Sequence, residues 1–151
     1  MSSRPWNPAV TVAAVIERDG RFLVIEEVDG DQTVFNQPAG HWEPGESLIE
    51  ACSRETLEEA AHPFIPTRLV GIYHWLHPET GKTFLRFAFS GQVGAEEIGR
   101  VLDEGIVRAL WLTVDELRVL RPRHRSPLVM RCVDDYLAGR SYPLELIAHV
   151  G

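Results

Sequence analysis

The amino-acid sequence predicts an α/β fold, in which helices flank a mixed β-sheet. Short runs rich in valine, isoleucine and aromatic residues recur along the chain, as is typical of strands. Segments with helix start and stop signals follow several of these runs. Because strands and helices come from different parts of the chain, we expect an α/β sandwich around the sheet. The length of 151 residues predicts a single domain, residues 1–151.

The first predicted elements are strands. Val10–Ile16 and Phe22–Ile25 are rich in β-branched residues and flank the turn pair Asp19-Gly20, which predicts a hairpin. Val34–Gln37 is a short extended piece that ends at Pro38. A loop rich in polar residues, glycine and proline is expected to follow.

A helix is predicted from Ser47 to Ala61. Ser47 fits an N-cap, and Glu50 three residues later completes the pattern of a capping box. Pro63 is expected to stop the helix.

The second half of the chain begins with another predicted hairpin. Thr67–Leu76 and Thr83–Val93 carry β-branched and aromatic residues on either side of the turn Pro78–Gly81. Ile106–Leu112 has the same character and predicts a further strand.

Two helices are predicted near the carboxyl end. A short helix begins after Thr113, a suitable N-cap, and runs to Leu120. The last helix covers Ser126–Ala138, with Pro127 at its first position and Gly139 closing it.

Composition and charge restrict the partners. The formal net charge of −7 argues against binding to nucleic acid or to an anionic membrane, so a phosphorylated substrate would need a cation as intermediary. Cys52 and Cys132 form neither a disulfide framework nor a zinc motif, and we expect two core residues in a reducing compartment. Met1–Pro8 lacks the apolar stretch of a secretory signal, and Ala9–Ile16 is too short to cross a membrane. We therefore expect a soluble, cytoplasmic protein.

Three carboxylates share one side of the predicted helix Ser47–Ala61. With Glu55 at 0°, Glu58 lies at about −60° and Glu59 at about +40°. Three neighbouring carboxylates repel one another unless a cation compensates them, and Mg²⁺ prefers oxygen ligands. The alternative is a solvated acidic face on which Glu50 and Arg54 pair.

The segment G-H-W-E-P-G-E-S-L-I-E-A-C-S-R-E-T-L-E-E-A-A resembles the Nudix box. The fixed positions of that pattern are matched by Gly40, Glu46, Arg54, Glu55, Glu58 and Glu59. The resemblance implies a Nudix-like α/β/α sandwich around a mixed β-sheet and a hydrolase of phosphoric anhydride bonds. It also implies that Glu55, Glu58 and Glu59 hold Mg²⁺ or Mn²⁺, that the Gly40 carbonyl adds a ligand, and that Arg54 pairs with Glu46 and orients Glu55.

Three positions depart from the Nudix box. Thr56 replaces an aliphatic residue, Ala61 a glycine and His62 an aliphatic residue. Alanine adopts the left-handed conformation of a helix end at a cost of roughly 1 kcal/mol, so we expect the helix to end differently, with Pro63 as the stop. His62 either caps the helix or tunes the pH response of the site.

Segments outside the box resemble the NudJ-type Nudix phosphatases over Ala9–Ile147. They are F-N-Q-P-A-G-H, H-W-L-H-P, F-L-R-F-A-F, R-S-P-L-V and Y-P-L-E-L-I. This resemblance implies release of inorganic phosphate from nucleoside di- and triphosphates, from hydroxymethylpyrimidine pyrophosphate and from thiamine pyrophosphate. Two alternatives stay open: a pyrophosphohydrolase that releases pyrophosphate from nucleoside triphosphates, and a non-catalytic ligand sensor. The oligomeric state, monomer or homodimer, is also open.

Substrate contacts are expected around the box. Asn36 and Gln37 carry amides suited to the edge of a purine or pyrimidine, and His41 follows in the same segment. Trp75 is a candidate for stacking, as are His74 and Trp42. Arg86 grips a phosphate or forms a structural ion pair. The base that activates water is Glu55 or one of the loop acids Glu96, Glu97, Asp103 and Glu104.

Overall fold

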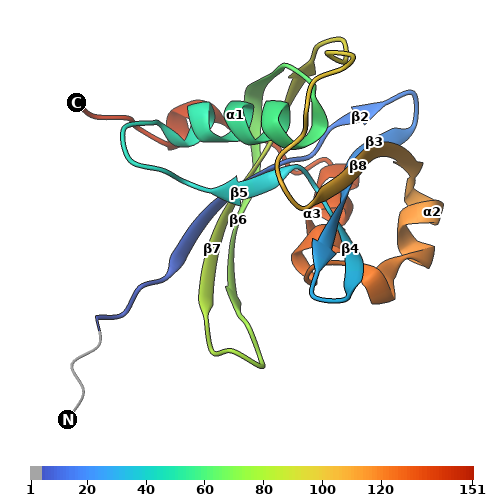
Figure 1. Cartoon of the computed structure of the whole chain (residues 1–151). Helices are drawn as coiled ribbons and strands as arrows, with labels where there is room; N and C mark the ends of the chain where they lie inside the picture. Colours follow the sequence, from blue (N-terminus) through green and yellow to red (C-terminus); the bar gives the residue numbers. More distant parts are fainter. Residues whose placement is uncertain (1–4) are drawn as a thin grey trace.

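The computed structural model describes residues 5–151, which form two β-sheets with helices packed around them (Figure 1). One sheet has five strands in the order β5-β1-β7-β6-β9, and in the other the central strand β3 pairs with β2, β4 and β8. The strands are β1 (Ala9–Ala14), β2 (Glu17–Arg18), β3 (Arg21–Asp29), β4 (Gln32–Asn36), β5 (Ala39–His41), β6 (Phe64–Leu76), β7 (Thr83–Val93), β8 (Ile106–Thr113) and β9 (Tyr142–Pro143).

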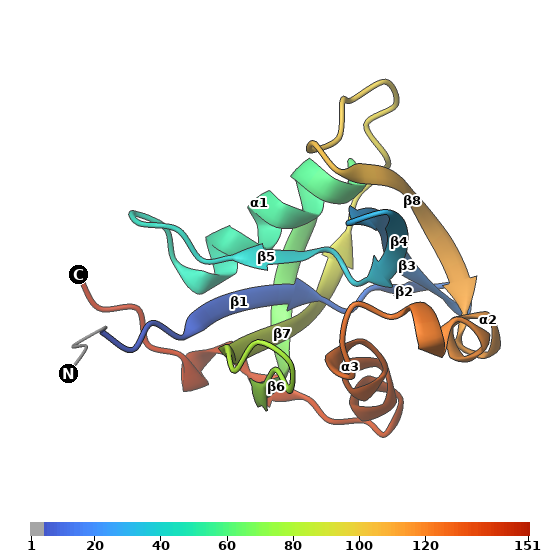
Figure 2. The same cartoon turned by 60° about the horizontal axis from the view of Figure 1, so that its bottom comes forward.

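Three α-helices of residues 5–151 pack on the sheets, and the first and third cover opposite faces of the five-stranded sheet (Figure 2). They are α1 (Leu48–Ala60), α2 (Val114–Val119) and α3 (Leu128–Leu137), with short 3-10 helices at Arg121–Arg123 and Leu144–Leu146. Figure 2 shows α1 on one side of β1, β5 and β7 and α3 on the other. The side chains of β1 alternate accordingly: Val12 and Ala14 pack in the cluster that contains Cys52 of α1, and Ala13 packs in the cluster that contains Cys132 of α3.

The α/β class and the mixed sheet are confirmed. β1 runs parallel to β7, whereas β5, β6 and β9 pair antiparallel with their neighbours. The second sheet is antiparallel throughout. That residues 1–151 form one domain stays a prediction. The expectation that Met1–Pro8 is not a secretory signal concerns a segment that lies partly outside the described residues.

The first predicted hairpin is only partly correct. Asp19 and Gly20 do turn the chain, with φ of 53° and 77°, but they join β2 to β3. β1 pairs with β5 and β7 in the other sheet. The chain changes sheets just after β1, where the amide of Val15 donates to Phe89 and the carbonyl of Ile16 accepts from Leu23.

The polar loop expected after Pro38 contains a strand. β5 pairs antiparallel with β1, with Gly40 opposite Val12 and His41 opposite Thr11. A three-residue strand at a sheet edge depends on its neighbour for its hydrogen bonds, so local sequence gives little sign of it. The hairpin of β6 and β7 is confirmed, with β6 beginning at Phe64.

The three predicted helices are confirmed. Ser47 and Glu50 form a capping box at α1, and Thr113 and Glu116 form one at α2. The last helix begins at Leu128, so Pro127 occupies the N-cap position and not the first helical position.

The carboxyl end of α1 differs from the expectation. Ala61 itself takes the left-handed conformation, with φ of 55°, and its amide donates to the Leu57 carbonyl. Thr56, the other small departure, is fully buried and donates its hydroxyl to the Cys52 carbonyl at 2.8 Å, so its polar group is satisfied.

Both cysteines are buried and free, as predicted for core residues. Burial raises the pKa of the Cys52 thiol and of the Cys132 thiol, which keeps both thiols protonated. Among residues 5–151 no helix is long and apolar enough to span a membrane.

Candidate metal centre and substrate cavity

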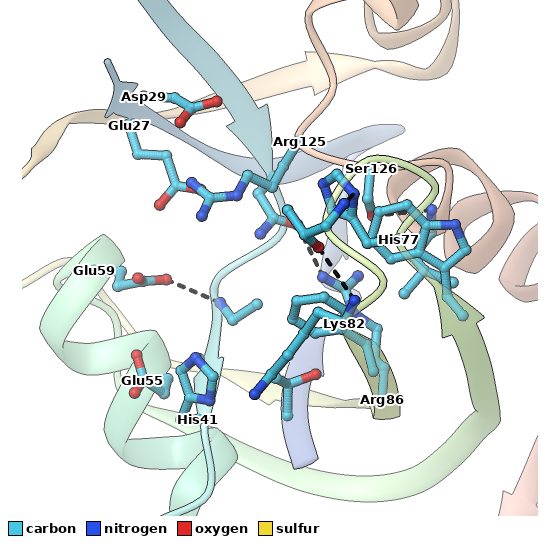
Figure 3. Close-up of a pocket in the computed structure, with 18 of the residues that line it drawn as sticks. Glu27, Asp29, His41, Glu55, Glu59, His77, Lys82, Arg86, Arg125 and Ser126 are labelled. Atoms are coloured by element: carbon cyan, nitrogen blue, oxygen red, sulfur yellow. Dashed lines mark hydrogen bonds and ion pairs between the residues drawn. The ribbon is translucent and has the colours of Figure 1, made fainter. Parts of the chain in front are cut away.

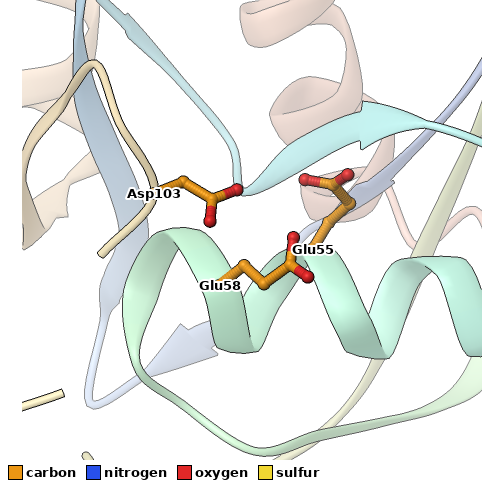
Figure 4. Close-up of side chains that lie close together, drawn as sticks. All are labelled: Glu55, Glu58 and Asp103. Atoms are coloured by element: carbon orange, nitrogen blue, oxygen red, sulfur yellow. The ribbon is translucent and has the colours of Figure 1, made fainter. Parts of the chain in front are cut away.

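The acidic side of α1 meets one residue of a distant loop. Ligand oxygens of Glu55, Glu58 and Asp103 lie within 4.8 Å of one another (Figure 4). Asp103 precedes β8, and its amide donates to the Glu58 carbonyl at 3.0 Å, which fixes the loop against the helix. Sequence reasoning grouped Asp103 with three other loop acids and had no local signal to single it out.

Glu59 is not part of this group. Its carboxylate accepts a hydrogen bond from the Ala39 amide at 2.9 Å, and its side chain reaches the edge strand β5. Glu59 therefore lies outside the group formed by Glu55, Glu58 and Asp103, and its expected role as a metal ligand stays a prediction.

The acids of this region favour their protonated forms more than free carboxyls do. Burial raises the pKa of Glu55 to about 7, against the opposing effect of Arg54. Burial raises the pKa of Glu59 to about 9, although the Ala39 amide lowers it. Burial, followed by the charge of Asp103, raises the pKa of Glu58. A divalent cation would compensate these charges, and the oxygen donor set fits Mg²⁺ or Mn²⁺.

Gly40 has a steric role in this arrangement. A Cβ atom added at Gly40 would lie 2.2 Å from Cδ of Glu55 and 2.3 Å from its Oε1. The Glu55 carboxylate thus lies directly on the backbone of β5, and a glycine at this position is required by the close approach. This is independent of the expected role of the Gly40 carbonyl as a ligand, which stays a prediction.

Arg54 connects the loop after β5 to the acidic helix side. Its Nε and Nη2 donate to the Glu46 carboxylate at 2.9 and 2.8 Å, forming the expected ion pair in bidentate geometry. Its Nη1 donates to Glu55 at 2.8 Å and to Glu58 at 3.2 Å. Its Nη2 also donates to the His41 carbonyl at 3.1 Å. One guanidinium therefore orients two carboxylates and attaches β5 to α1.

His62 is buried at the end of α1. Its Nδ1 lies 3.1 Å from the Gly94 carbonyl, and its ring packs edge-on against Trp111 with centroids 5.6 Å apart. These contacts attach the end of α1 to the segment after β7 and to β8. That His62 tunes the pH response stays a prediction.

A cavity of about 740 Å³ begins at Glu55 and Glu59 and extends along the sheet (Figure 3). Strand register places His41, Thr11 and Arg86 in one row across β5, β1 and β7. The residues lining the cavity are Thr11, Glu27, Asp29, Asn36, Ala39, Gly40, His41, Glu43, Glu55, Glu59, Trp75, His77, Thr80, Lys82, Phe84, Arg86, Arg125, Ser126 and Leu128. The cavity thus joins an acidic end to a wall that contains three cationic side chains.

Most predicted substrate contacts do line this cavity. They are Asn36, His41, Trp75 and Arg86. Gln37 lies just behind the cavity wall, where its Nε2 donates to the Val129 carbonyl at 2.6 Å. Trp42 and His74 are not among the lining residues, and the indole of Trp42 donates to the Glu46 carbonyl at 2.7 Å.

Sequence reasoning missed several cavity residues. Lys82 and His77 come from the turn of the β6–β7 hairpin, and Arg125 and Ser126 precede α3. Glu27 of β3 lies 3.2 Å from Arg125, and burial raises its pKa. These residues converge only through tertiary packing. The sequence signal available for Arg125 and Ser126 was their presence in the segment R-S-P-L-V.

The chain is similar to known proteins of one family. A family model described as the NUDIX domain matches residues 5–131. Proteins named Phosphatase NudJ from Escherichia coli K12 and Shigella flexneri are 37% identical over 143 residues, which are 94% of this chain and 92% of theirs. A solved NUDIX hydrolase from Nitrosomonas europaea is 54% identical with a TM-score of 0.93, over 95% of this chain and 98% of that one. A MutT NUDIX hydrolase from Burkholderia pseudomallei, 20% identical with a TM-score of 0.71 over 85% and 98% of the two chains, shares the fold.

Proposed function

This chain belongs to the Nudix family of hydrolases that act on phosphoric anhydrides, and we propose that it is a metal-dependent phosphatase of small phosphorylated metabolites. The substrates we propose are nucleoside di- and triphosphates, hydroxymethylpyrimidine pyrophosphate and thiamine pyrophosphate, with release of inorganic phosphate. The name Phosphatase NudJ, carried by relatives 37% identical to this chain, supports this choice over pyrophosphate release. The intact acidic group argues against a non-catalytic sensor.

One observation carries the proposal: Glu55 belongs both to the acidic group with Glu58 and Asp103 and to the lining of the cavity. A cation held by that group would therefore lie at the end of a space large enough for a nucleotide-sized ligand. Lys82 lines the same cavity and supplies a positive charge that attracts phosphate oxygens.

We assign the following roles to the protein's own groups. Arg54 holds Glu55 and Glu58 in their relative positions, and Glu59 holds the Ala39 amide and thereby β5. Glu55, Glu58 and Asp103 would hold the divalent cation, which when bound supplies charge neutralisation of the diphosphate and a lower pKa for the attacking water. Because Glu55 and Glu59 line the cavity, we propose one of them as the acceptor of the water's proton.

The test is a panel of nucleoside di- and triphosphates and the two thiamine-related pyrophosphates, incubated with Mg²⁺, with Mn²⁺ and with EDTA. Phosphate and pyrophosphate are measured separately. We expect phosphate as the main product, and no turnover in EDTA. Pyrophosphate as the main product from triphosphates would replace our proposal with the pyrophosphohydrolase. Undiminished turnover in EDTA would refute the metal dependence.

We also propose the compartment in which the protein acts and the kind of partner it binds. The two buried free cysteines suit a reducing compartment, which supports action in the cytoplasm. The net charge of −7 supports small metabolites and not nucleic acid as partners.

A further inference from the structure

Arg86 is a buried cation held by neutral groups. It lies in β7 and is 5% exposed. Its Nη1 donates to Oε1 of Gln37 at 2.9 Å and lies 3.8 Å from the Cys132 sulfur, and its Nη2 donates to Oδ1 of Asn36 at 3.1 Å. The expectation of a structural ion pair is not met, because none of the ion pairs among residues 5–151 includes Arg86.

One donor of this guanidinium is unused. Within residues 5–151, Nε of Arg86 is buried and has no hydrogen-bond partner. Leaving a buried charged donor unpaired is costly, and such a group in a native protein calls for an explanation, such as a functional role or a bound water or ion. Asn36 adds a second donor at the same place, because its amide oxygen is occupied by Arg86 and its amide nitrogen can only donate.

Arg86 and the Glu55 carboxylate lie on opposite sides of the five-stranded sheet. Glu55 lies on Gly40, whose partner Val12 faces α1. Arg86 pairs in register with Thr11, one residue away from Val12, and contacts Cys132 of α3. Because neighbouring residues of a strand face opposite sides, Arg86 lies on the α3 side. Because Arg86 and Glu55 line one cavity, a substrate whose phosphates lie at Glu55 has room for its organic part at Arg86.

The walls near Arg86 suit a flat ring. Trp75 and Phe84 line the cavity, with ring centroids 5.6 Å apart. Aromatic walls favour stacking of a heterocycle, and the ammonium of Lys82, which donates to the Asn7 carbonyl at 2.8 Å, keeps further donors for a phosphate.

We propose that Arg86 and Asn36 form a subsite for the edge of a nitrogen heterocycle in the substrate. A ring carbonyl oxygen or unprotonated ring nitrogen accepts from the amide nitrogen of Asn36, whose orientation Arg86 fixes, while the ring lies along Trp75. The inference rests on the proposed function only for the identity of the reaction, because binding at this subsite involves neither metal nor hydrolysis. It replaces the expectation that Arg86 grips a phosphate.

The test measures equilibrium binding in EDTA. The probes are the four ribonucleoside 5′-monophosphates and ribose 5-phosphate, which lacks a base. The proteins are wild type, Arg86→Lys, Asn36→Asp and the control Arg68→Gln, which removes an exposed arginine of β6 that donates to the Ser141 hydroxyl. We expect wild type to bind at least one nucleotide roughly 10-fold or more tighter than ribose 5-phosphate, a ratio typical of hydrogen bonds to a charged group.

Arg86→Lys and Asn36→Asp should each remove that preference and leave ribose 5-phosphate binding within about 2-fold, and Arg68→Gln should keep it. Asn36→Asp places a carboxylate beside the buried guanidinium, so this variant should stay folded and decides the question if Arg86→Lys unfolds. The proposal is overturned if wild type shows no base preference, if Asn36→Asp keeps it, or if both variants lose ribose 5-phosphate binding equally. Failure of the phosphatase assay would leave these results unaffected, since no turnover is measured.

Discussion

The carboxylate of Glu55 lies against the α-carbon of Gly40, so closely that a Cβ there would be 2.2 Å from Cδ of Glu55. This contact joins the acidic side of α1 to the edge strand β5. The same strand receives Glu59 at the Ala39 amide and Arg54 at the His41 carbonyl. Three consecutive residues of β5 are therefore each in contact with one of the charged side chains of α1.

The variant Gly40→Ala tests this contact. The added methyl must displace Glu55, so we expect Mg²⁺ affinity to fall by about 10-fold or more and the free energy of unfolding to fall by about 1–3 kcal/mol. Gly94→Ala is the control, because a Cβ there would lie 3.2 Å from the Pro63 side chain and needs only a small adjustment. Titration with Mg²⁺ and urea unfolding give both values. Equal behaviour of the two variants would contradict the steric role.

Asp103 should contribute to metal binding although it lies outside the Nudix box. We expect Asp103→Asn to weaken Mg²⁺ or Mn²⁺ binding by roughly 10-fold to 100-fold, because it removes one of three clustered carboxylates. Glu104→Gln removes the same charge from the neighbouring position and should bind like wild type. Isothermal titration calorimetry measures both. If the two variants bind the metal alike, Asp103 is only a loop residue.

The stability of the metal-free protein should depend on pH through Glu55 and Glu59. Their pKa values rise from an ordinary 4.5 to about 7 and about 9 in the fold, so the fold favours the protonated carboxyls. This stabilising contribution is complete below about pH 4.5 and is lost as pH rises through 7 and 9. In EDTA we expect Tm to decline over that range, and to decline less in Glu59→Gln, whose side chain stays neutral. Parallel Tm curves for wild type and variant would disprove this origin.

Arg54 should not be replaceable by lysine. A lysine keeps the charge but cannot reproduce the two-point contact with Glu46 while contacting Glu55 and Glu58. We expect Arg54→Lys to lower kcat by about 10-fold or more and to leave KM nearly unchanged, since Arg54 positions carboxylates and does not line the cavity. Arg100→Lys, at an exposed pair with Glu97, is the control and should match wild type. A change confined to KM would argue against a positioning role.

The end of α1 offers a prediction on stability alone. Ala61 has φ of 55°, and glycine would relieve about 1 kcal/mol of backbone strain while losing a buried methyl group. Ala61→Gly should therefore change the free energy of unfolding by less than about 1 kcal/mol. Ala60→Gly, within the helix, should lower it by about 1–2 kcal/mol. Chemical denaturation compares the two, and a larger loss for Ala61→Gly would contradict the account of this helix end.

What the sequence predicted correctly was mostly local. The caps at Ser47 and Thr113 and the turn between β6 and β7 depend on residues only a few positions apart. The ion pair of Glu46 with Arg54 was also predicted, but from the resemblance to the Nudix box and not from local sequence signals. These features need no knowledge of how distant segments pack.

What the sequence missed depends on distant segments. The hairpin predicted for β1 was wrong, because β1 pairs with β5 and β7, which follow much later in the chain. Asp103 meets Glu58 through a loop whose local sequence carries no structural pattern. Arg86 has neutral partners because β4, β7 and α3 converge around it. The sequence next to Arg86 does not predict these partners, since they come from distant segments.

The short segment Asn36–His41 has two differently used sides. Its first residues hold Arg86 on the side of α3, and its last residues contact the charged side chains of α1. The proposed metal site and the proposed ring subsite therefore lie on separate surfaces of one stretch of chain. Under the two proposals, substitutions around Arg86 would change the substrate preference and leave the carboxylates of α1 in place.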